Sequence, residues 1–248
     1  MLKQSIRNVL NILGYEINKI NKMNSNFPVL KPIDPHGVDI LANSAFQTSC
    51  LEIAQLTLLD TERLANLWQL CRLSNPDGNI LEVGAYKGGG ALHLSNCCPE
   101  RKVIVCDSFD GFETLDPELD TNFSATMFKD NNRETVEKLF LKRLRKAEVI
   151  AGFFPASLKG KNIGPVSFVH LDVDIYKPTL ESLYYISEEL AIKNSIIVLD
   201  DYLRNAKGVD QAVREFTQYK RDWVCFPLFP GQGLLLHSSW FDNLKSGV

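Results

Sequence analysis

Residues 79–90 read NILEVGAYKGGG and carry the clearest indication of the fold. Its first five residues form a short apolar run bounded by turn residues, which predicts a buried β-strand. Glycines at 84 and 88–90 then let the backbone turn sharply and approach a ligand without a Cβ in the way. A strand that passes through a glycine-rich turn into a helix predicts the first unit of a parallel α/β sheet.

The same alternation of strand and helix continues along the chain. Apolar runs that predict further strands occupy 102–106, 147–151, 166–171 and 195–199, and helical patterns lie at about 59–73, 90–98, 131–146, 178–192 and 208–219. Strands that are apolar on both faces belong in a parallel sheet covered by helices on both sides. Two last runs, at 223–229 and 233–240, predict an antiparallel hairpin at the sheet edge. The predicted fold is α/β and Rossmann-like, with a mostly parallel seven-stranded sheet that ends in this hairpin.

Residues 1–54 are predicted to be an N-terminal helix followed by a loop or lid, and residues 55–248 to be the main domain. Apolar residues recur at helical spacing from Leu2 to Ile20. This stripe is typical of a docking helix or a dimer arm, so a homodimer is one expected assembly, and a membrane-surface helix is the alternative. Residues 24–47 carry prolines and a glycine with little periodicity, which indicates the loop.

The composition argues against several classes of protein. The 248 residues are 45% hydrophobic and 23% charged, as in ordinary globular proteins. A net charge of −3 gives no electrostatic reason to expect a nucleic-acid partner. No apolar run approaches the roughly 20 residues of a transmembrane helix, and the N-terminus lacks the apolar core of a signal peptide. The six cysteines show no C-x-x-C pair or metal-ligand spacing, so we expect small buried hydrophobes in a cytoplasmic protein.

A nucleoside site is expected at the carboxyl ends of the first strands, where parallel sheets bind ligands. The glycine spacing is G-x-x-x-G-G, which differs from the G-x-G-x-x-G turn that seats a pyrophosphate. The loop therefore suits a cofactor without phosphates, such as S-adenosylmethionine. Asp107 follows the second strand, where an acidic side chain can accept both ribose hydroxyls, or alternatively cap the next turn. Gly152 and Phe153 follow the third strand and offer an edge for the adenine ring.

A cluster of carboxylates is predicted where the fourth and fifth strands end. Asp172 and Asp174 follow the fourth strand in LDVDIYKPT, and Asp200 and Asp201 follow the fifth in VLDDY. The strand–helix–strand unit makes these strands parallel neighbours, so both ends emerge on one edge of the sheet. Two carboxylates about 4 Å apart repel by roughly 4 kcal/mol at an effective dielectric of about 20. Such a cluster must be protonated, splayed into water or neutralised by a cation. Oxygen ligands favour Mg²⁺ as that cation, whereas helix-capping aspartates are the alternative interpretation.

The cluster suggests a chemistry for the site. Asp172, Asp200 and Asp201 are the expected metal ligands, and Asp174 is the expected base. A divalent ion bound to a hydroxyl lowers its pKa, and a nearby carboxylate can take the proton. The resulting oxygen can then attack the methyl group of a sulfonium in line.

Two other features have an undecided or structural interpretation. The acidic loop 107–122 is either a cap over the substrate, with Phe109 and Phe112 as contacts, or a solvated surface loop. The four histidines are scattered without ligand-spaced partners, and His170 is expected to pack in the core.

Five ordered motifs resemble those of a known family: ILEVGAYKGGG, CDSFDGF, LDVDIYKPT, VLDDY and GVDQAVREF. Together they resemble the macrocin O-methyltransferase family, over about residues 55–237. Members of that family methylate sugar hydroxyls of macrolides and related natural products. The resemblance implies a class I methyltransferase fold, S-adenosylmethionine, Mg²⁺ and the same roles for the four aspartates. The partner it implies is a small-molecule hydroxyl acceptor, a sugar or glycoside.

The resemblance extends to the cofactor loop. GAYKG resembles the loop of catechol O-methyltransferase, which implies that Glu82 and Tyr86 line the methionine and ribose end. Thr57 sits where the family closes over the cofactor. The expected cofactor-binding residues are Thr57, Glu82, Gly84, Ala85, Tyr86, Gly88, Asp107, Ser108, Gly152, Phe153 and Asp172. The chain departs from the family pattern at Val173, usually glycine, and at AIKNS, where a glycine pair is usual, and neither departure touches a ligand.

Two other functions compete with methyl transfer. A metal-dependent glycosyltransferase would also carry a D-x-D motif, but it leaves the glycine loop and Asp200–Asp201 without a role. A non-catalytic S-adenosylmethionine-binding protein is expected to have lost acidic ligands, and this chain retains all four. We therefore expect an O-methyltransferase that acts on a sugar hydroxyl of a natural product or glycan, with a catechol-like phenol as the second acceptor class.

Overall fold

The computed structural model describes residues 2–12, 15–19, 28–32, 40–143 and 145–244. Within these residues a nine-stranded sheet forms, in the order β1-β2-β8-β9-β7-β6-β3-β4-β5. The strands are β1 (Tyr15–Lys19), β2 (Pro28–Pro32), β3 (Asn79–Val83), β4 (Val103–Asp107), β5 (Ala147–Ala151), β6 (Val166–Leu171), β7 (Ala191–Leu199), β8 (Trp223–Leu228) and β9 (Gln232–His237). The run β5-β4-β3-β6-β7 is parallel, and β9 pairs antiparallel with both β7 and β8. The predicted seven-stranded sheet with its terminal hairpin is confirmed.

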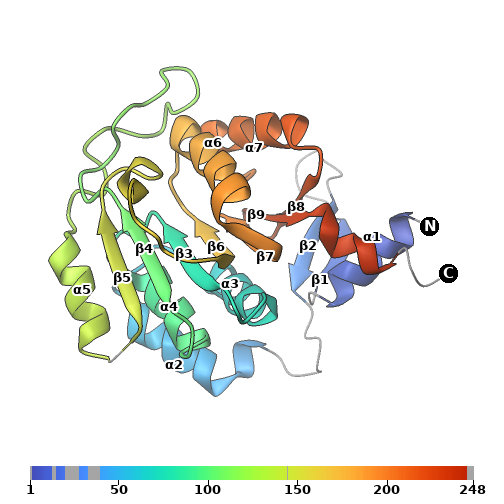
Figure 1. The fold of residues 1–248 in the computed structure, drawn as a ribbon, viewed down its shortest axis with the longest axis horizontal. Helices are drawn as coiled ribbons and strands as arrows, with labels where there is room; N and C mark the ends of the chain where they lie inside the picture. Colours follow the sequence, from blue (N-terminus) through green and yellow to red (C-terminus); the bar gives the residue numbers. More distant parts are fainter. Residues whose placement is uncertain (1, 13–14, 20–27, 33–39, 144, 245–248) are drawn as a thin grey trace.

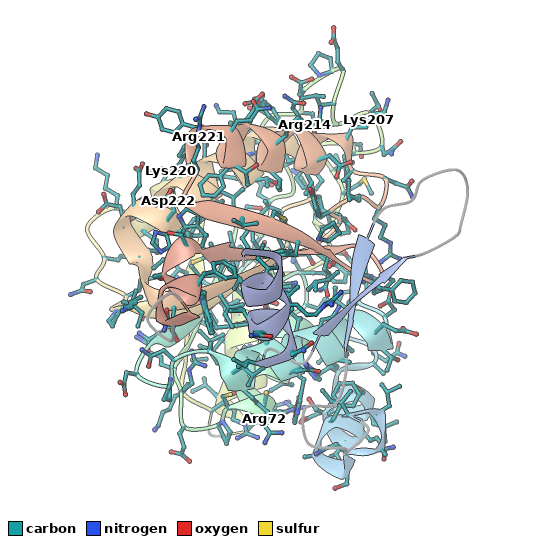
Figure 2. The ribbon with its side chains drawn as sticks, turned by 90° about the vertical axis from the view of Figure 1, so that its right-hand side faces the viewer. Arg72, Lys207, Arg214, Lys220, Arg221 and Asp222 are labelled. Carbon is teal, nitrogen blue, oxygen red and sulfur yellow. The ribbon has the colours of Figure 1, made fainter. Side chains whose placement is uncertain are left out.

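Helices cover both faces of this sheet (Figure 1). They are α1 (Leu2–Ile12), α2 (Ser44–Ile53), α3 (Thr61–Leu73), α4 (Gly89–Cys97), α5 (Arg133–Leu141), α6 (Tyr176–Tyr185), which continues into a π-helical turn, and α7 (Lys207–Tyr219). Helices α6 and α7 lie on one side, and α2, α3 and α4 lie on the other. Figure 2 shows the same division, with Lys207 and Arg214 of α7 on the opposite side of the sheet from Arg72 of α3.

The two layers of helices bury two hydrophobic cores, one on each face of the sheet. Successive side chains of a strand point to opposite faces. Ile80 accordingly packs in the core that contains Leu67 and Leu92 of α3 and α4, whereas Leu81 packs in the core that contains Val213 and Phe216 of α7. This alternation explains why the strand sequences are apolar at nearly every position.

The N-terminal region differs from the sequence prediction. The helix ends at Ile12, and residues 15–19 form β1, which pairs antiparallel with β2. β2 pairs with β8 at Leu30 and Leu228 and so extends the sheet beyond the hairpin. The loop predicted over 24–47 is therefore wrong for β2 and for the start of α2, while residues 20–27 and 33–39 lie outside the described residues. Without β2, the strand β8 would be an unpaired edge of the sheet. Such an edge is a template for further strands, which explains why residues 28–32 form a strand.

None of the helices in the described ranges has the length and apolar character needed to cross a bilayer. The boundary predicted between residues 54 and 55 stays a prediction.

Candidate active site

A cavity of about 460 Å³ opens where the parallel strands end. The predicted residues that line it are Thr57, Glu82, Gly84, Ala85, Tyr86, Asp107, Ser108, Gly152, Phe153, Asp172, Asp174, Asp200 and Asp201. Gly88 is the one expected cofactor-binding residue that does not line it. The structure thus brings the expected cofactor loop and the expected carboxylate cluster to one cavity.

Two glycines of the loop have separate structural roles. Gly84 has a φ of +82°, and a Cβ at this position would lie 1.8 Å from the carbonyl oxygen of Asp172. The Asp172 N–H also donates to the Val83 carbonyl at 2.8 Å, so the loop and the carboxylate cluster are joined through backbone. Gly88, with a φ of +83°, is the N-cap of α4, and a Cβ there would meet Val136 of α5 at 3.0 Å. Gly88 therefore shapes the loop through close packing and does not line the cavity.

Asp107 holds the glycine-rich loop in place. Its Oδ2 accepts from the backbone N–H groups of Ala85 at 2.7 Å and Tyr86 at 2.9 Å. Its Oδ1 accepts from the Phe109 N–H at 2.7 Å, which is the turn-capping contact that the sequence left as an alternative. A carboxylate offers about four acceptor sites, so the three backbone hydrogen bonds occupy most of them.

Glu82 and His170 form a buried pair at the base of the cavity. The two residues are direct partners in the pairing of β3 with β6, and His170 Nδ1 lies 2.9 Å from Glu82 Oε1. Burial raises the pKa of Glu82, and the hydrogen bond to His170 opposes this rise. His170 Nε2 is buried without a hydrogen-bond partner among the described residues. A ring nitrogen of His170 lies within 4.8 Å of carboxylate oxygens of Asp172 and Asp200. The core position expected for His170 is confirmed, but the ring also lines the cavity.

The four aspartates form two overlapping groups around Asp172. Carboxylate oxygens of Asp172, Asp174 and Asp201 lie within 4.8 Å of one another. Asp172 and Asp200 form a second group of the same size with His170. Asp174 and Asp201 adopt positive φ values of 64° and 58°, a conformation that aspartate tolerates better than most residues and that is common at functional sites.

Arg63 provides the cationic partner of this cluster in the described residues. Its Nη1 forms a buried ion pair with Asp200 Oδ2 and lies 3.9 Å from Asp201 Oδ1. Its Nη2 donates to the Leu58 carbonyl at 2.9 Å, and its Nε lies 3.2 Å from Asp60, the N-cap of α3. The guanidinium therefore joins the segment before α3 to the end of β7.

The electrostatics of the cluster follow from burial and mutual repulsion. Burial raises the pKa of Asp172 well above its usual range, and the charge of Asp200 adds to this. Burial raises the pKa of Asp174 in the same way, with the charge of Asp201 as the next cause. The pKa of Asp200 is also raised by burial, although Arg63 opposes the shift. One guanidinium leaves the four carboxylates short of positive charge.

The acidic loop contributes aromatic side chains to the cavity. Phe112 lines it together with Phe123 and Phe128, and its ring centroid lies 5.7 and 5.8 Å from theirs. Phe109, the other predicted contact, packs against the core cluster on the α3 and α4 side.

Sequence reasoning missed Arg63 and the exposure of His170 to the cavity. The position of His170 in the cavity could have been predicted from the sequence. Residues two apart on a strand share a face, and Asp172 is two positions away. The role of Arg63 could not have been predicted in this way, since an arginine in the first turn of a helix is ordinarily exposed.

Solved structures share this architecture. The O-methyltransferase NovP superposes with a TM-score of 0.60 at 18% identity, over 73% of this chain and 81% of that one. The calicheamicin methyltransferase CalS11 gives 0.53 at 16% identity, over 82% and 98% of the two chains. An O-methyltransferase from Bacillus cereus in complex with SAH gives 0.50 at 17% identity, over 78% and 90%. No curated protein sequence matches the chain significantly.

The strand order, the glycine loop and the cavity at the strand ends define a class I methyltransferase. Residues 51–222 match the family described as macrocin O-methyltransferase (TylF). The chain belongs to this family, so it is an S-adenosylmethionine-dependent O-methyltransferase, and the resemblance expected from the sequence is confirmed.

Proposed function

We propose that this protein methylates a sugar hydroxyl of a natural product or glycan, with Mg²⁺ held by Asp172, Asp200 and Asp201. The observation that carries the proposal is the carboxylate cluster beside the glycine loop in one cavity. A methyltransferase needs no acidic cluster to bind its cofactor. Four carboxylates with one guanidinium therefore have their simplest explanation in a bound cation.

The residues fit a divalent metal ion by their chemistry. Carboxylate oxygens are the ligands that Mg²⁺ prefers in proteins. The carboxylates of Asp172, Asp174 and Asp201 already lie within 4.8 Å of one another. The unpartnered His170 Nε2 is a further buried polar atom next to Asp172 and Asp200. Asp200 would have to share its charge between the ion and Arg63.

Asp174 is the proposed base. Burial raises its pKa, so its carboxylate holds a proton more readily than an exposed aspartate would. A base is most effective when its pKa approaches the working pH. A divalent ion bound at this cluster would supply the complementary effect, by lowering the pKa of a hydroxyl brought beside it. Asp174 would then take that proton while the hydroxyl oxygen attacks the methyl group.

The cofactor is proposed to lie along the loop after β3. Gly84 and Ala85 would place backbone against it, and Asp107 would accept one ribose hydroxyl with its remaining lone pair. Glu82 and Thr57 line the same cavity. Gly152 and Phe153, at the end of β5, are proposed to contact the adenine.

The acceptor is proposed to lie against aromatic rings in the acidic loop and in the segment that follows it. Phe112 and Phe128 present apolar surface to the cavity, which suits the C–H face of a sugar ring or the aglycone that carries it. Two structural neighbours are the O-methyltransferase NovP and CalS11, a calicheamicin methyltransferase. They support a glycoside as the first acceptor class to test.

The test is transfer of a labelled methyl group from S-adenosylmethionine to a panel of sugars, glycosides and catechols. We expect incorporation into a glycoside in Mg²⁺ and none in EDTA. Equal incorporation in EDTA would contradict the metal proposal, and incorporation into catechols alone would contradict the sugar proposal. Titration calorimetry with nucleotide sugars and with S-adenosylmethionine tests the alternative of a glycosyltransferase. A glycosyltransferase would bind the nucleotide sugar and would not bind S-adenosylmethionine.

A further inference from the structure

Three cysteines from two helices meet at the opposite end of the sheet from the methyl-transfer cavity. Cys71 lies in the last turn of α3, Cys97 ends α4, and Cys98 is the C-cap of α4. The Sγ atoms of Cys71 and Cys98 are 3.7 Å apart, and those of Cys97 and Cys98 are 3.8 Å apart. All three Sγ atoms lie within 4.8 Å of one another. No sequence spacing indicates this group, because two of its members are adjacent and the third is on another helix.

The sulfur spacing matches that of a thiolate metal site. Zn²⁺ binds cysteine sulfur at about 2.3 Å in tetrahedral geometry, which places the sulfurs about 3.8 Å apart. Thiols that contact one another without a metal ion have similar separations, so the charges around the sulfurs are also needed to indicate a metal site. The charges around the cluster supply the second observation.

Two helix C-termini and one arginine surround the sulfurs. The carbonyl ends of α3 and α4 favour a positive charge, and the Trp68 carbonyl accepts from Cys97 Sγ at 3.1 Å. Arg101 Nη1 lies 3.8 Å from Cys71 Sγ and 3.2 Å from the Cys71 carbonyl. The guanidinium favours thiolate, and the helix ends favour a cation among the thiolates.

Arg101 is fixed at this position by a network of its own. It donates to the Gly78 carbonyl at 2.9 Å and to Ser74 Oγ and Ser167 Oγ at 2.8 and 2.7 Å. These bonds tie it to the start of β3, whereas the cavity lies beyond the end of β3. The cluster therefore belongs to a separate part of the molecule.

An ion must be able to reach the sulfurs and displace their protons. Metal binding to cysteine releases the thiol protons, since thiolate is the ligand. Cys97 and Cys98 are only half-buried, so an ion can reach them.

We propose that Cys71, Cys97 and Cys98 form a binding site for one divalent thiophilic ion, of which Zn²⁺ is the type, with water as the fourth ligand. Three thiolates and one divalent ion carry a single negative charge, which the guanidinium of Arg101 balances. Soft thiolate ligands select this class of ion over Mg²⁺. The ion would clamp the end of α3 to the end of α4, whose first turn follows the glycine loop.

Cadmium titration tests the proposal, because only thiolate ligands give Cd²⁺ its ultraviolet charge-transfer absorption. The full chain is kept reduced, stripped with EDTA, desalted and held in excess Mg²⁺, which covers the carboxylate cluster. The test variant is Cys98→Ser, at a half-buried position where the fold tolerates a change. Cys50→Ser is the matched control, because Cys50 is also half-buried but lies outside the cluster.

We expect one equivalent of Cd²⁺ to saturate the absorption in the wild type and in Cys50→Ser. Loss of a residue that only hydrogen-bonds to a metal ligand costs about 10–100-fold in metal affinity. Cys98→Ser removes a direct ligand, so it should lower the affinity for Cd²⁺ by at least roughly 100-fold. Zn²⁺ should raise the thermal midpoint of the wild type in Mg²⁺ but not that of Cys98→Ser. The absence of a stoichiometric absorption, or equal affinities in wild type and Cys98→Ser, would overturn the proposal. Neither readout depends on methyl transfer.

Discussion

Replacement of Arg63 by methionine should destabilise the metal-free protein strongly. Methionine keeps an unbranched, flexible side chain, although a shorter one, and it removes the charge. Arg63 is 7% exposed and Asp200 is 2% exposed, so the change leaves a buried carboxylate without its partner. Breaking a buried ion pair in this way costs about 3–5 kcal/mol. For a chain of this size that corresponds to a fall of roughly 6–20 °C in the thermal midpoint.

The assay is thermal and urea denaturation in EDTA, repeated with Mg²⁺. The control is Lys102→Met, whose partner Glu148 lies 2.6 Å away but whose pair is about half exposed, so its loss should cost only about 0–1 kcal/mol. Mg²⁺ should recover more stability in Arg63→Met than in wild type, because the ion then supplies the missing charge. A loss no larger than that of Lys102→Met would refute the reasoning. So would full additivity with Asp200→Asn, since residues that interact show coupled effects.

Three further predictions concern the same cavity. Gly84→Ala should lower the denaturation midpoint more than Gly160→Ala. Both glycines have a positive φ, which alone costs about 1–3 kcal/mol, but only at Gly84 would the Cβ also clash with the Asp172 carbonyl. Equal losses of stability in the two variants would contradict the clash. Asp174→Asn should abolish methyl transfer and leave S-adenosylmethionine binding intact by calorimetry, and an unchanged rate would remove its role as base. Burial raises the folded-state pKa values of Asp172, Asp174 and Asp200, so their protonated carboxyls stabilise the fold at low pH and this contribution is lost as pH rises through those values. The metal-free protein should therefore lose unfolding free energy as the pH rises above about 4, the usual pKa of aspartate. Mg²⁺ should restore more of it at higher pH, and a pH-independent effect of Mg²⁺ would argue against the cluster as its site.

The strands of the sheet were predictable because turn residues mark their ends. β3, β5 and β6 have the bounds that the sequence predicts, and glycine or proline stands close to each of them. The N-terminal strands were not predictable in the same way. YEINK satisfies a helical stripe as well as a strand, and it becomes β1 because β2 and the edge of β8 are there to pair with.

The carboxylate cluster was predictable from topology. Asp172 and Asp200 each follow an apolar run, and a parallel unit must bring such ends together. The contact between Arg63 and Asp200 was not predictable, because it joins residues 137 positions apart and places an arginine where solvent is the usual expectation. The bonds of Asp107 to the glycine loop depend on backbone amides, which a sequence pattern does not display.

The proposed function requires a metal ion and S-adenosylmethionine to share this cavity. A crystal structure of the protein with Mn²⁺ and S-adenosylhomocysteine tests this, because anomalous scattering locates the ion. We predict an anomalous peak bound by Asp172, Asp200 and Asp201, with the adenosyl group along the loop after β3. The proposal would be contradicted if S-adenosylhomocysteine is bound in the cavity but no peak lies on these aspartates and Arg63 still pairs with Asp200.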